Sequence, residues 1–86
     1  MNIDKVWVGV VRHRNGHDLF AADTEARLYD KLADFCAQHW HEVAHAMTGS
    51  TGDEMEQPPE NARELVDEYF ERHGDDEWVD IEEVNL

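Results

Sequence analysis

At 86 residues the chain has the size of one small domain, too short to enclose a deep substrate cleft, which argues against a pocket-based enzyme. Its 21 acidic residues against seven lysines and arginines give a net charge of −14, which argues against nucleic acid and anionic membranes as direct ligands. Cys36 is the single cysteine, so no intramolecular disulfide forms. There is no basic leader and no apolar run of the ~20 residues that cross a bilayer, so we expect a cytoplasmic protein.

The first quarter of the chain predicts two β-strands, at about residues 4–13 and 17–22. Residues 6–11 are rich in β-branched and aromatic side chains, which favour a strand. The pair Asn15-Gly16 lies between the two segments and is typical of a type I′ turn, in which both central residues have positive φ. We therefore expect an antiparallel hairpin.

A long helix is predicted next, from a cap at Asp23 or Thr24 to about Met47. Glu25 in the first turn is favourably placed against the helix dipole, and residues 48–52 are small and polar enough to end the helix. Residues 48–58 show no periodicity, and we expect them to form a mobile connection.

A second helix is predicted after Pro58, because Pro59 suits a first helical turn and Gly74 suits the position just after the last one. One apolar stripe at helical spacing supports it, made of Ala62, Leu65, Val66, Tyr69 and Phe70. A final strand begins at Trp78, and its alternation slips at Glu82-Glu83, where we expect a bulge.

The order ββααβ predicts the fold class. We expect residues 1–86 to form a single α+β domain, a two-layer sandwich with an antiparallel sheet of about three strands and two helices on one face. Each structural segment contains one tryptophan, and we expect Trp7, Trp40 and Trp78 to belong to the core of this sandwich.

Residues 41–45 read His-Glu-Val-Ala-His, which resembles the HExxH motif of zinc peptidases. The resemblance implies that His41 and His45 bind zinc and that Glu42 acts as the base, which makes a small zinc-dependent hydrolase the alternative function. On the predicted helix, however, both histidines point away from the apolar stripe, and no chain remains to build a second lobe over them. Our main prediction is therefore no enzyme, no metal and no cofactor.

The negative charge is concentrated in the second part of the chain. Residues 53–86 contain 14 of the 21 acids and only two bases, Arg63 and Arg72. On the second helix, carboxylates project away from the apolar stripe as one anionic ridge, and the run continues beyond the helix. The predicted partner-binding residues are Glu60, Glu64, Asp67, Glu68, Glu71, Asp75, Asp76 and Glu77.

Such a ridge suggests a basic protein partner that normally handles nucleic acid. Carboxylates at i, i+3 and i+4 have a spacing comparable with that of phosphates on a strand, so the ridge would mimic nucleic acid and block the partner's groove. A similar strategy serves small inhibitors encoded by phages and plasmids, including some anti-CRISPR proteins. Two alternatives stay open: the acids serve solubility or adaptation to high salt, or the chain forms a homodimer through a sheet edge or a Trp-bearing surface.

Overall fold

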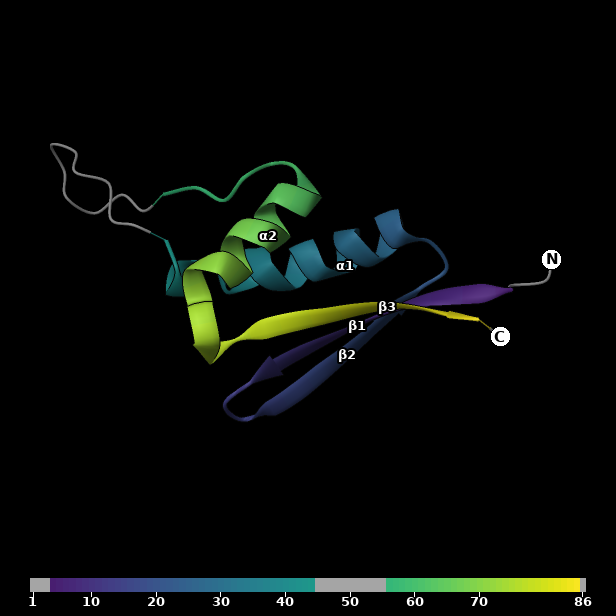
Figure 1. Cartoon of the computed structure of the whole chain (residues 1–86). Coiled ribbons are helices and arrows are strands. Elements are labelled where there is room, and N and C mark those ends of the chain that lie inside the picture. Colours follow the sequence, from purple (N-terminus) through teal and green to yellow (C-terminus); the bar gives the residue numbers. More distant parts are fainter. Residues whose placement is uncertain (1–3, 45–55, 86) are drawn as a thin grey trace, which may run out of the picture.

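The computed structural model describes residues 4–44 and 56–85, which fold into a sheet covered on one face by two helices (Figure 1). The main order ββααβ confirms the predicted α+β class. The elements are β1 (Lys5–His13), β2 (Gly16–Ala22), α1 (Glu25–Gln38), the 3₁₀ helix η1 (Trp40–Glu42), α2 (Ala62–His73), the 3₁₀ helix η2 (Gly74–Asp76) and β3 (Trp78–Asn85). Most of the predicted mobile connection, 48–58, lies outside the described residues.

The sheet is antiparallel, with β1 in the centre and the strand order β2-β1-β3. Gly9 on β1 lies opposite Phe20 on β2 and Ile81 on β3, so these three positions share the face that the helices cover. Glu82 and Glu83 pair with consecutive residues of β1 without interruption. The predicted bulge is therefore wrong, and the acidic pair lies within a regular strand.

The hairpin between β1 and β2 differs from the predicted turn. His13 pairs with Gly16, so Arg14 and Asn15 form the two-residue loop. Gly16 has φ 136°, whereas no residue other than glycine has positive φ in the described chain. The type I′ assignment is therefore wrong, because neither loop residue, Arg14 or Asn15, has positive φ, and Gly16, which does, is paired with His13.

Helix α1 begins as predicted but ends early. The Thr24 hydroxyl oxygen accepts a hydrogen bond from the Arg27 amide at 3.1 Å, which is an N-cap. The helix ends at Gln38, nine residues before the predicted Met47. Because α1 ends here, Trp40 lies in η1, where it is buried and donates its indole N–H to the Glu56 carbonyl at 2.9 Å.

Helix α2 begins three residues later than Pro59, at Ala62. Asn61 caps it, because its side-chain oxygen accepts from the Glu64 amide at 3.0 Å. Gly74 ends the helix with φ 62°, as its position in the sequence predicts.

The core lies between the helices and the sheet. Helix α1 approaches the sheet closely above Gly9, where a Cβ atom would lie 3.3 Å from the Leu32 Cδ1. The buried apolar residues are Val11, Ala22, Leu28, Leu32, Ala33, Cys36, Trp40, Leu65, Val66 and Tyr69. Within the described ranges, no helix has the length and apolar content needed to cross a membrane.

The opposite face of the sheet bears apolar side chains that the helices do not cover. Trp78 is 47% exposed and Leu19 is 67% exposed. The prediction of a core position is therefore wrong for Trp78, because its register opposite Arg12 puts it on the outer face. Trp40 is buried as predicted and Trp7 packs partly against the core. The homodimer stays a prediction, and this face is the Trp-bearing surface it would use.

Cys36 is expected to react very slowly while the protein is folded. Its side chain is fully buried, and burial, with the charge of Glu77 adding to it, raises the pKa of the thiol to about 12. Because the thiolate is the reactive form, we expect labelling at pH 8 by an aromatic disulfide reagent to be at least ~100-fold slower in native protein than in guanidinium chloride. Equal labelling rates in the two conditions would contradict the buried position.

Candidate functional site

One side of α2 carries four of the predicted carboxylates, at Glu64, Asp67, Glu68 and Glu71. Leu65, Val66 and Tyr69 are buried on the opposite side of the helix, so the acids at helical spacing between them face solvent. The acids before, within and after α2 together form what we name the α2 acidic surface. It consists of Glu60, Glu64, Asp67, Glu68, Glu71, Asp75 and Asp76, of which all except the half-buried Glu68 are exposed.

Most of these acids form no ion pair with another described residue. Glu68 accepts a hydrogen bond from the Arg72 Nε at 3.0 Å. Across residues 4–44 and 56–85, no ion pair reaches the other six acids of the surface. Like charges at i+3 or i+4 on a helix cost about 0.2–0.5 kcal/mol per pair, so the pattern lowers the stability of α2 instead of raising it.

Glu77 does not extend this surface. Its side chain is buried, with the residue 8% exposed, and it points into the interior from the segment between η2 and β3. There its Oε1 accepts a hydrogen bond from the Tyr69 hydroxyl at 3.0 Å. The prediction that Glu77 belongs to the ridge is therefore not met, because the chain turns at Gly74 and reverses the side on which Glu77 lies.

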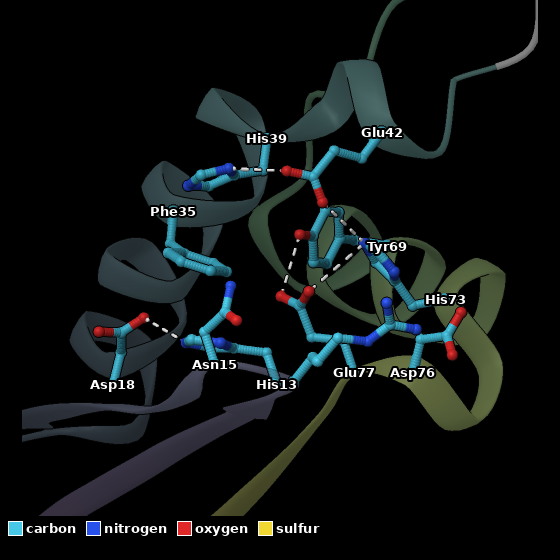
Figure 2. A pocket seen from close by; sticks show the side chains of 11 residues that line it. His13, Asn15, Asp18, Phe35, His39, Glu42, Tyr69, His73, Asp76 and Glu77 are labelled. Carbon is cyan, nitrogen blue, oxygen red and sulfur yellow. Dashed lines mark hydrogen bonds and ion pairs between the residues drawn. The ribbon is translucent and has the colours of Figure 1, made fainter.

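A second cluster of titratable groups surrounds Glu77. Figure 2 shows Glu42, His73 and Glu77 pointing toward one another from η1, from the end of α2 and from the segment before β3. The His73 Nε2 atom lies 3.4 Å from the Glu42 Oε1 and 3.7 Å from the Glu77 Oε2. The His73 side chain is only 13% exposed. We name these three residues the inner cluster.

Neighbouring side chains orient both carboxylates of the inner cluster. The His39 Nδ1 lies 3.0 Å from the Glu42 Oε2, and the Tyr69 hydroxyl donates to the Glu77 Oε1 (Figure 2). Burial, together with the charge of Glu77, raises the pKa of the Tyr69 phenol far above its ordinary value. Tyr69 therefore stays a hydrogen-bond donor over the whole physiological pH range.

Arg72 holds η1 against α2 and so positions Glu42. Its guanidinium forms an ion pair with Glu56 and donates to the Val43 carbonyl at 3.3 Å. It also lies over the Trp40 ring, with its Cζ 4.9 Å from the ring centroid. The hydrogen bond with Glu56 is the main cause that raises the pKa of Arg72 above its already high value. The charge is thus permanent, and the contact is a fixed link between segments distant in sequence.

The inner cluster opens into a cavity of about 460 Å³. The hairpin loop between β1 and β2 forms one wall of this cavity, and the ends of α1 and α2 form the other. In addition to the inner cluster, its lining includes His13, Asn15, Asp18, Phe35, His39 and Asp76. His13 and Asp18 lie 3.2 Å apart at their closest atoms, so the hairpin wall carries an ion pair when His13 is protonated.

The HExxH residues do not have the helical setting of the motif. His41 and Glu42 lie in η1, a 3₁₀ helix of three residues, and α1 has already ended at Gln38. The predicted helical face for two zinc ligands is therefore wrong at His41, while His45 lies outside the described residues. Glu42 instead faces His73, with which it shares no sequence motif.

Sequence reasoning missed His73. A signal was present, because His73 follows Tyr69 by four residues and Val66 by seven, which puts it on the buried stripe of α2. Helical spacing alone therefore predicts an inward imidazole. No such spacing in the sequence distinguishes Glu77 from Asp75 and Asp76.

Comparison with protein-family models, with curated proteins and with solved structures finds no match for this chain.

Proposed function

We propose that the protein binds a basic surface of a nucleic-acid-handling protein through the α2 acidic surface. The observation that supports the proposal is the lack of ion pairs at six exposed carboxylates before, within and after α2, in the part of the chain that the structure describes. Charge left uncompensated lowers the stability of the free protein, and a cationic partner would offset that cost.

The mechanism would be occlusion. Carboxylates at i, i+3 and i+4 rise about 4.5–6 Å along a helix, so Glu64, Asp67 and Glu71 would occupy phosphate positions in a groove built for nucleic acid. The field of the whole chain, with net charge −14, would speed encounter with such a groove. An inhibitor encoded by a phage or plasmid, including an anti-CRISPR protein, would act in this way.

Capture of a partner tests the proposal. Wild-type protein and a variant with Glu64, Asp67 and Glu71 changed to lysine are immobilised and exposed to lysate of the source organism and its hosts, at low and moderate salt. We expect a basic nucleic-acid-binding protein on the wild type alone, and we expect added DNA or RNA to displace it. Equal capture by both proteins, or capture insensitive to nucleic acid, would contradict mimicry.

A further inference from the structure

We propose that the inner cluster, Glu42, His73 and Glu77, binds one divalent transition-metal ion such as Zn²⁺. The inference is independent of the α2 acidic surface, because the two sets of residues do not overlap. It also differs from the HExxH motif, since the structure makes Glu42 a ligand and gives His41 no part in the site.

A buried nitrogen of His73 lacks a hydrogen-bond partner in the part of the chain that the structure describes. Its Nε2 atom is inaccessible to solvent and has no hydrogen-bond partner among the described residues. The two nearest carboxylate oxygens, at 3.4 and 3.7 Å, are within ion-pair range but beyond the usual N–H···O distance. Buried polar atoms are seldom left without a partner, and a bound cation would supply one here.

The ligand atoms of the three residues are spaced to share one ion. Ligands bound at ~2.0–2.2 Å around a tetrahedral ion lie roughly 3.3–3.6 Å from one another. Of the two distances from the His73 Nε2, 3.4 Å lies within that range and 3.7 Å lies just above it, and one ligand atom from each of the three residues lies within 4.8 Å of the others. The distances from the His73 Nε2 to the two carboxylate oxygens are long for hydrogen bonds, but they suit ligands that share one ion.

Neighbouring side chains hold the two carboxylate ligands in place. His39 holds one oxygen of Glu42 and Tyr69 holds one oxygen of Glu77, which leaves the other oxygen of each carboxylate turned toward His73. Metal sites commonly have this second layer of hydrogen bonds, because it fixes the orientation of the ligands. Here each carboxylate has its own donor.

Charge and ligand type indicate the class of ion. Two carboxylates and one neutral imidazole carry a charge of −2, which a divalent cation balances. Histidine nitrogen with carboxylate oxygen suits zinc and similar transition metals better than calcium or magnesium, which prefer oxygen ligands alone. With three protein ligands beside the cavity, a fourth coordination position would be left for solvent.

The test is zinc binding to untagged protein freed of metal by a chelator. Titration calorimetry measures stoichiometry and affinity, and the visible spectrum of the Co²⁺ form reports the coordination geometry. We expect one ion per chain in the wild type, and at least 10-fold weaker binding in Glu42→Gln and in Glu77→Gln. Because the Glu42 side chain is 38% exposed, Glu42→Gln should fold, which circular dichroism will check.

The matched control is His41→Gln, a change in the neighbouring exposed residue of η1. The inner cluster predicts unchanged affinity in this variant, whereas an HExxH site predicts loss of zinc in His41→Gln and retention in Glu42→Gln. Absence of stoichiometric binding by the wild type, or unchanged affinity in both glutamine variants of the inner cluster, would overturn the proposal. Loss of zinc in His41→Gln would overturn it in favour of the motif.

Discussion

Replacing Leu32 with alanine is expected to lower the free energy of unfolding by about 2–5 kcal/mol. Leu32 is fully buried, and its Cδ atoms lie against the sheet where Gly9 leaves no side chain. The substitution leaves a cavity next to β1. Gly9 cannot fill this cavity, because it has no side chain. A domain of this size has a total stability of roughly 4–13 kcal/mol, so the variant would be substantially unfolded near room temperature if the wild type lies at the lower end.

Urea denaturation followed by far-ultraviolet circular dichroism measures this effect. Leu19→Ala is the matched control, because it makes the same chemical change at a side chain that is 67% exposed on the outer face of the sheet. We expect the control to change stability by about 0.5 kcal/mol or less. Similar losses in the two variants would show that α1 does not pack on the sheet in this way.

Reversing three charges of the α2 acidic surface is expected to weaken partner binding by ~10–100-fold. The variant changes Glu64, Asp67 and Glu71 to lysine, and all three side chains are exposed in the free protein. If each lost ion pair contributes about 0.5–1 kcal/mol, the three together give 1.5–3 kcal/mol, and every 1.4 kcal/mol is about tenfold in affinity. Surface plasmon resonance with the captured partner measures the change.

The control must alter the net charge by the same amount at other places. Changing Asp4, Asp34 and Glu82 to lysine does so, because these exposed acids lie before β1, on α1 and on β3. Each triple variant moves the net charge from −14 to −8, since three replacements add two charges each. We expect the dispersed variant to lose less than threefold in affinity. Equal losses would mean that net charge, and not the α2 acidic surface, governs binding.

Hydrophobic periodicity predicted the elements better than their ends. The stripe from Ala62 to Phe70 placed α2 correctly, because burial of one helical face dominates the local structure. The end of α1 was predicted nine residues too late, since the sequence continues with residues that tolerate a helix. We attribute the early end of α1 to the burial of Trp40 and to its hydrogen bond with a carbonyl 16 residues away. Neither contact can be predicted from the residues next to the end of the helix.

The inner cluster shows where sequence reasoning fails. Glu77 follows Asp75 and Asp76 in an acidic run, and in the sequence alone all three acids are expected to be exposed. The turn at η2 exposes two of them and buries the third against Tyr69. The HExxH motif marked Glu42 as a candidate base. Its partner in the structure, His73, lies 31 positions later in the sequence and on another helix. Only the packing of α1, η1 and α2 brings these groups together.

A salt series tests whether the α2 acidic surface binds its partner through charge. The affinity of the wild type for its captured partner is measured from 0.05 to about 0.5 M salt, a range over which the screening length falls from roughly 14 to 4 Å. If exposed carboxylates of the α2 acidic surface hold a basic groove, the affinity falls steeply with salt, and the Glu64/Asp67/Glu71 variant shows a much shallower dependence. Affinity that stays constant across the series would contradict binding through the α2 acidic surface.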